Sequence, residues 1–187
     1  MKIILASKSP RRRELLSEIC TDFDIITAET DETLPEGMHP SKGVEILAIR
    51  KGEPIARMYP DALVISSDTL VELNGEALGK PVDEEDSYNT LEKLSGVFHN
   101  VHTGVAVHYR GKVFSGVDST AVKFKTMTKE EILEYIATGE PKDKAGSYGI
   151  QGIGGKFVEG YVGNYDTVVG LSVSLLRSLM EAAYDET

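Results

Sequence analysis

The chain has 187 residues, of which 41% are hydrophobic and 27% are charged, a composition typical of a soluble globular protein. The formal net charge of -10 argues against a broad basic face, so we expect no nucleic-acid polymer as a partner. We also expect no membrane partner and no signal peptide, because the chain has neither a long apolar run nor an apolar N-terminal core. Cys20 is the only cysteine, which favours a cytoplasmic protein without an intramolecular disulfide.

The N-terminal stretch combines a strand pattern with an unusual helix start. Residues 3–6 are apolar and predict a buried strand, and residues 10–19 predict a helix with Ser9 as its N-cap and Pro10 at its first position. Three arginines, at 11–13, occupy the first turn, where the helix dipole is already positive. A phosphate bound there would relieve this conflict. A basic turn facing solvent would explain the same residues.

An acidic loop and a long helix follow a short strand predicted at 23–26. The loop at 29–35 carries clustered carboxylates, which are either solvated or available to a metal ion. A helix is predicted from Ser41, and Lys51 lies on its apolar stripe. The lysine either turns outward to solvent or points into a polar cleft. Gly52 and Pro54 predict that the regular helix ends close to Lys51.

The clearest buried strand is residues 62–68, and Asp68 is predicted to lie at its carboxyl end. Ligand sites in α/β sheets lie beyond such ends, so Asp68 is a candidate for chemistry, although it could equally cap the next turn. Asn74-Gly75 then predicts a hairpin. Lys80 follows in a turn stiffened by Pro81.

The next part alternates helices and strands. A helix is predicted at 84–94, strands at 101–108 and 113–124, and a further helix from the capping box Thr128–Glu131. Three histidines, His99, His102 and His108, scatter over both faces of the first strand. We interpret them as ordinary strand residues rather than as metal ligands.

A glycine-rich stretch, residues 139–155, has six glycines in seventeen residues together with basic, amide and aromatic groups. It predicts either a loop that lets the backbone approach a ligand or a mobile surface loop. A strand at 156–162, a turn at 164–167 and a closing helix follow. The whole pattern predicts an α/β fold, with a mixed twisted sheet flanked by helices and two lobes around a central ligand cleft.

The sequence resembles the Maf family from residue 3 to about residue 180. The resemblance is carried by collinear motifs at 6–16, 67–69, 79–81, 94–96, 102–105 and 143–152. It implies a single Maf-like domain over residues 1–187 with a Maf/ITPase-like fold. It also implies a nucleoside triphosphate pyrophosphatase, which cleaves between the α and β phosphates with a divalent metal cation. Arg11, Thr69 and Gln151 are most similar to the branch that acts on dTTP and UTP.

The resemblance also implies roles for individual residues. Asp68 is the catalytic residue, either as the base toward the attacking water or as a metal ligand. Glu32 is the second carboxylate for the metal, for which Mg²⁺ or Mn²⁺ is expected. Arg11, Thr69 and Gln151 set substrate specificity. The phosphates are neutralised by a further set of residues, namely Ser7, Arg12, Lys51, Lys80 and Lys144.

Two positions depart from the family pattern, and two other functions stay open. The family usually has Lys-Ala where this chain has Lys51-Gly52, and Gly-Leu-Pro where it has Gly170-Leu171-Ser172. Both departures bear on helix ends more than on chemistry. The alternatives are a nucleotide-binding regulator of septum formation and cell division, and a pyrophosphatase for another modified nucleotide. The resemblance also implies a homodimer.

Overall fold

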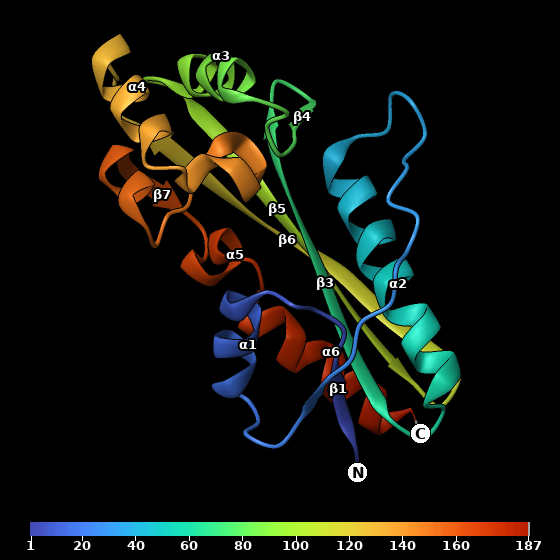
Figure 1. Ribbon diagram of the computed structural model, residues 1–187. Helices are drawn as coiled ribbons and strands as arrows, with labels where there is room; N and C mark the ends of the chain where they lie inside the picture. The colour runs from blue at the N-terminus through green and yellow to red at the C-terminus, as the bar shows by residue number, and fades with distance from the viewer. Residues whose placement is uncertain (187) are drawn as a thin grey trace.

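Three long strands form the middle of one mixed sheet with seven strands (Figure 1). They are β3 (Leu63–Leu73), β5 (Phe98–Tyr109) and β6 (Lys112–Phe124), paired antiparallel in that order. The shorter strands are β1 (Ile3–Leu5), β2 (Asp24–Ile25), β4 (Glu76–Leu78) and β7 (Val158–Val162). The sheet order is β2-β1-β3-β5-β6-β7, with β4 paired to β3. Among residues 1–186, only β1 makes parallel pairs, with β2 and β3. The computed structural model describes residues 1–186.

One face of the sheet is covered by the long helix α2 (Pro40–Met58). Alternate residues of a strand point to opposite faces, so Ile4 and Val64 share this face and pack with Ile55 of α2. At two glycines α2 comes close to β5. A Cβ on Gly104 would collide with the backbone of Val44, and one on Gly52 would lie 2.5 Å from the His108 ring.

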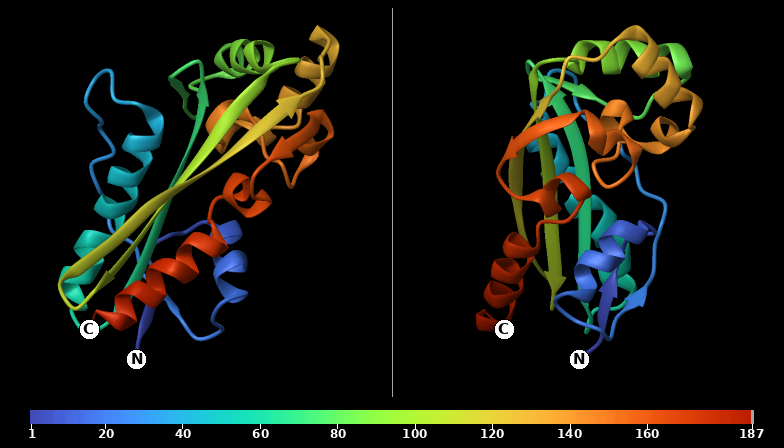
Figure 2. Two further views of the ribbon diagram at one scale, coloured as in Figure 1. Left: turned by 180° about the vertical axis from the view of Figure 1, so that it is seen from behind. Right: turned by 90° about the vertical axis from the view of Figure 1, so that its left-hand side faces the viewer.

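The opposite face carries two separate apolar clusters, each covered by helices that Figure 2 shows from two further sides. The first lies under α1 (Pro10–Ser17) and α6 (Val173–Asp185). The second lies under α3 (Glu84–Leu94) and α4 (Lys129–Ala137), together with three short 3₁₀ turns: Glu140–Asp143, Ala145–Ser147 and Ile153–Phe157. In Figure 1 the short helix α5 (Tyr165–Val169) lies between β7 and α1. The predicted mixed sheet with flanking helices is therefore confirmed.

Locally coded elements match their predictions closely. The helix at 84–94 has the predicted bounds, and the capping box between Thr128 and Glu131 is formed in both directions. Asn74-Gly75 forms the turn between β3 and β4. Ser9 accepts a hydrogen bond from the backbone N–H of Arg12, as expected of an N-cap.

Three predictions are wrong at element boundaries. Strand β3 does not end at Asp68 but continues to Leu73, because β5 and β4 stay paired with it to that point. Helix α2 continues past Gly52 and Pro54 to Met58, because burial of Ile55 against the sheet outweighs their poor helix propensity. Residues 165–169 form a short helix rather than a turn. Among residues 1–186, no helix has both the length and the apolar character needed to cross a membrane.

Candidate active site

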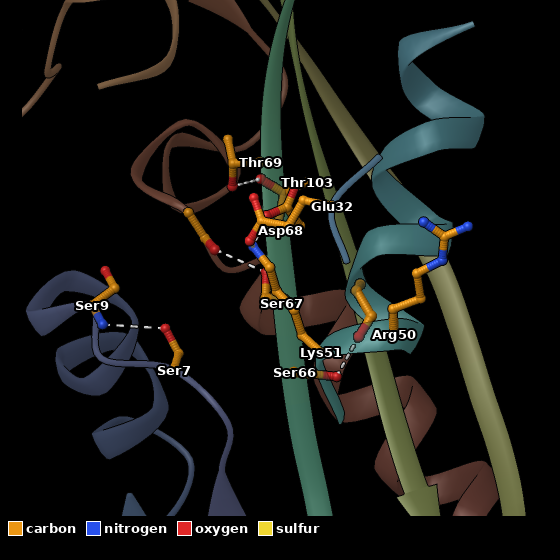
Figure 3. Close-up of polar contacts among 12 residues, drawn as sticks. Ser7, Ser9, Glu32, Arg50, Lys51, Ser66, Ser67, Asp68, Thr69 and Thr103 are labelled. Carbon is orange, nitrogen blue, oxygen red and sulfur yellow. Dashed lines mark hydrogen bonds and ion pairs between the residues drawn. The ribbon is translucent and has the colours of Figure 1, made fainter. Parts of the chain in front are cut away.

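The centre of the candidate site is an ammonium group held between two carboxylates (Figure 3). Lys51 Nζ donates to Asp68 Oδ1 and lies 3.1 Å from Glu32 Oε1. Asp68 is largely buried, with 11% of its side chain exposed, whereas Glu32 is 62% exposed. The structure therefore brings together three predicted residues that come from a strand, a helix and a loop.

The reach of Lys51 follows from helix geometry. Side chains of a helix tilt toward its N-terminus, so Lys51 extends back along α2 and reaches Asp68 on the facing strand. Two residues before Asp68, Ser66 Oγ donates to the Ala48 carbonyl at 2.6 Å and fixes the helix on this face. Lys51 thus points into the polar interface between α2 and the sheet, rather than outward to solvent.

Arg50, the neighbour of Lys51, holds the acidic loop against α2. Its Nη1 donates to the carbonyls of Thr33 at 2.6 Å and Asp31 at 3.3 Å, so it grips the backbone on both sides of Glu32. Figure 3 shows Arg50 pointing away from Asp68, which separates its role from that of Lys51. The sequence predicts no role for Arg50, because nothing in its local pattern indicates a contact seventeen residues away.

A second group forms on the other face of β3. Arg12 Nε donates to the Gly170 carbonyl at 2.8 Å, and its Nη2 donates to Thr69 Oγ1 at 3.3 Å. Ser67 Oγ donates to the same Gly170 carbonyl at 3.0 Å. Burial lowers the pKa of the Arg12 guanidinium, partly opposed by the negative charge of Asp68. Because Asp68 and Thr69 are consecutive strand residues, the two groups share one strand but lie on its opposite faces.

Ser7 and Arg11 lie at the start of this second group. Ser7 is 7% exposed, and its Oγ accepts the backbone N–H of Ser9 at 3.2 Å (Figure 3). The hydrogen bond from Lys144 lowers the pKa of the Asp143 carboxyl, and the positive charge of Arg11 lowers it further. In the glycine-rich stretch, Lys144 Nζ lies 3.0 Å from Asp143 Oδ1.

The side chains of Lys80 and Gln151 are exposed. Lys80 follows Gly79, whose carbonyl accepts the backbone N–H of Gly146 at 3.1 Å, so its turn lies against the glycine-rich stretch. Gln151 lies in a turn that is fixed by hydrogen bonds to the Glu140 carboxylate. Glu140 accepts the backbone N–H groups of residues 153 and 154, both at 2.9 Å. The glycine-rich stretch is therefore anchored in place.

The three histidines make separate polar contacts. His99 Nε2 lies 2.7 Å from Tyr148 Oη, and His108 Nε2 lies 3.1 Å from the Ile49 carbonyl. His102 bridges Glu72 Oε2 at 3.0 Å and Ser119 Oγ at 2.6 Å. Their contacts agree with the interpretation of ordinary strand residues.

The carboxylates Glu32 and Asp68 fit a hard divalent cation. They already share one cation, the Lys51 ammonium, and both present oxygen ligands. Within residues 1–186, no three histidine, cysteine or acidic side chains gather as a complete metal cage. Mg²⁺ is commonly held by one or two carboxylates together with substrate phosphates, so two carboxylates suffice for this kind of site.

Comparisons with known proteins identify the family. The family described as Maf-like protein matches residues 2–183, so the chain belongs to the Maf family. Relatives named dTTP/UTP pyrophosphatase include one from Pelotomaculum thermopropionicum, 46% identical over 96% of this chain and 95% of its own length. Another, from Aquifex aeolicus, is 44% identical over 96% of this chain and 94% of its own length. A third, from Bacillus cereus (strain AH187), is 45% identical over 100% and 98%.

One solved structure overlaps with part of the fold. The Ham1 protein of Staphylococcus aureus covers 66% of this chain and 72% of its own, with a TM-score of 0.49 and 20% sequence identity.

Proposed function

We propose that this chain is a nucleoside triphosphate pyrophosphatase that hydrolyses dTTP and UTP to the monophosphate and pyrophosphate. The observation that carries the proposal is the largely buried Asp68, linked through Lys51 to Glu32 on one face of β3, while the partly buried Arg12 donates to the next residue, Thr69, on the other face. Carboxylates for a cation and nearby basic groups are what triphosphate hydrolysis requires. Relatives at 44–46% identity named dTTP/UTP pyrophosphatase support the substrate class.

The reaction adds water across the bond between the α and β phosphates. Asp68 would accept the proton of the attacking water, or hold the cation that activates it, and both roles stay open. Ser7, Arg11 and Arg12 would bind the phosphates from the start of α1, where the helix dipole favours anions. Lys51 would exchange its carboxylate partners for phosphate oxygens when a divalent cation takes its place.

We propose a divalent cation, Mg²⁺ or Mn²⁺, at Glu32 and Asp68. When bound, such a cation neutralises phosphate charge and lowers the pKa of a coordinated water. The Arg50 contacts support this proposal, because they fix the loop that carries Glu32 without using its carboxylate.

The specificity proposal concerns Arg11, Thr69 and Gln151. Gln151 would read the uracil or thymine edge, since an amide both donates and accepts hydrogen bonds. Lys80 and Lys144 would bind the phosphates from the side of the glycine-rich stretch. Arg11 and Thr69 complete the set of specificity residues.

Cytoplasmic nucleotide pools are the proposed source of substrate. The implied homodimer stays a prediction, which analytical ultracentrifugation tests.

The deciding experiment is a panel of pyrimidine and purine nucleoside triphosphates with Mg²⁺ or Mn²⁺, assayed separately for pyrophosphate and orthophosphate. The expected result is pyrophosphate from dTTP and UTP in preference to the purines. Release of orthophosphate would overturn the proposed cleavage position. Asp68→Asn should abolish turnover with the fold intact by circular dichroism, whereas Asp61→Asn, an exposed acid just before β3, is the matched control. Retained activity in Asp68→Asn would remove Asp68 from the mechanism.

A further inference from the structure

A row of polar side chains crosses the sheet between its two apolar clusters. The strand register pairs Thr69 of β3 with Thr103 of β5, and Thr103 with Asp118 of β6. On β5 the next residues on this face are Val101 and Val105, and they belong to different apolar clusters. The polar row is therefore the boundary at which the segment around α5 meets the sheet.

Asp118 is the anchor of that segment. Its Oδ2 accepts hydrogen bonds from Asn164 Nδ2 at 2.8 Å, Thr167 Oγ1 at 2.7 Å and Ser172 Oγ at 2.7 Å. Its Oδ1 accepts the backbone N–H of Ser119 at 2.9 Å. Burial alone would raise the pKa of this carboxyl, but the hydrogen bonds outweigh it and lower the pKa. The ionised carboxylate thus ties both ends of α5 to β6.

The anchored segment supplies two backbone carbonyls to the candidate site. The Thr167 carbonyl accepts from Thr103 Oγ1 at 2.7 Å, and Thr103 Oγ1 lies 2.9 Å from Thr69 Oγ1. The Gly170 carbonyl accepts from Arg12 Nε at 2.8 Å. Gly170 has a φ of 136°, which side-chain-bearing residues rarely adopt, so the direction of its carbonyl depends on how the segment is held.

We propose that Asp118 is a positioning residue for the Arg12 guanidinium. It fixes Thr167 and Ser172, these fix the Gly170 carbonyl, and that carbonyl orients Arg12. The inference rests on the proposed function, in which Arg12 binds phosphate. The Ser172 hydroxyl supports it, because it donates directly to Asp118 Oδ2 at 2.7 Å.

The kinetic test is a double-mutant cycle between Asp118 and Arg12, with kcat and KM measured for dTTP. Asp118→Asn keeps the side-chain shape and should lower kcat/KM by about tenfold, but by less than about twofold when Arg12 is already methionine. Glu72→Gln is the matched control, a buried carboxylate on the opposite face that accepts from Gly75 and Asn100. Its effect should be the same factor in both backgrounds. An equal factor for Asp118→Asn in both backgrounds would show that Asp118 is merely structural.

A second readout does not depend on activity. The Arg12 Nε–H signal, assigned by its loss in Arg12→Met, should exchange slowly with solvent in the wild-type protein because it donates to a carbonyl. Exchange should be about tenfold faster in Asp118→Asn. If the wild-type protein releases no pyrophosphate, the proposed function fails, and the Nε–H exchange still decides the role of Asp118. Equal protection in both proteins overturns the positioning role whatever the activity.

Discussion

Replacing Lys51 with methionine removes the ammonium that joins Asp68 to Glu32. The contact with Glu32 is worth about 0.2–1 kcal/mol, because that carboxylate is 62% exposed. The contact with Asp68 is worth about 1.5–3 kcal/mol, because Asp68 is largely buried and the hydrogen bond is charged. We therefore expect the metal-free variant to lose about 2–4 kcal/mol in its free energy of unfolding.

The same substitution should strengthen cation binding. In the wild-type protein a divalent cation entering between Glu32 and Asp68 competes with the Lys51 ammonium, whereas in Lys51→Met this competitor is gone. Affinity for Mn²⁺ should rise by about tenfold, which corresponds to about 1.4 kcal/mol. Mn²⁺ well above its Kd should then stabilise the variant more than the wild-type protein, since a ligand of the folded state stabilises it by an amount that grows with the logarithm of its affinity.

The assay is urea unfolding followed by circular dichroism, with EDTA or with Mn²⁺, because the chain has no tryptophan for fluorescence. Lys42→Met is the matched control, since it removes the same charge from the same helix at a lysine that pairs with Glu45 at 3.9 Å. Mn²⁺ should stabilise this control as much as the wild-type protein. Equal or weaker stabilisation of Lys51→Met would refute the reasoning that lysine and metal share one place.

Three further predictions concern the elements around this contact. Gly52→Ala should cost about 1–3 kcal/mol in urea unfolding, because the new Cβ would lie 2.5 Å from the His108 ring; an unchanged stability would contradict this packing. Arg50→Ala should speed amide exchange at 31–33 and raise KM for dTTP by about threefold or more, as it frees the Thr33 carbonyl. Burial lowers the pKa of His99 to about 4, so only the unfolded chain binds its proton between pH 6.5 and 4. Stability should fall by up to about 3 kcal/mol over this range, and His99→Gln should flatten the decline.

The sequence was most informative where structure is encoded locally. The capping box at Thr128 and the hairpin turn at Asn74-Gly75 depend on neighbouring residues, and both formed as predicted. The continuation of β3 beyond Asp68 depends on pairing with β5, 28 to 34 residues further along the chain, so the polar run ending in Asp68 was misread as the end of a strand. The assignment of Asp68 as the catalytic residue rests on the family resemblance, so the wrong strand end does not affect it.

Sequence patterns could not predict which residues of the site contact one another. The contact from Arg12 to Gly170 spans 158 residues, and no spacing rule relates the two. The arginines at the start of α1 suggested an anion, but not that Arg12 would donate to the Gly170 carbonyl. Asp118 belongs to no recognisable motif, because an aspartate in a strand of alternating polarity is common. Its importance depends on hydrogen bonds from Thr167 and Ser172, about fifty residues further along the chain.

Two glycines explain how one lysine can reach the middle of the sheet. Gly104 lies directly across from Asp68 in the strand register, and the backbone of Val44 occupies the space that a side chain there would need. Gly52 gives α2 the same close approach at its other end, against His108 of the same strand. With the helix seated at both points, Lys51 needs only the natural tilt of its side chain to meet Asp68. Gly52 therefore belongs to the geometry of the site and not merely to the end of a helix.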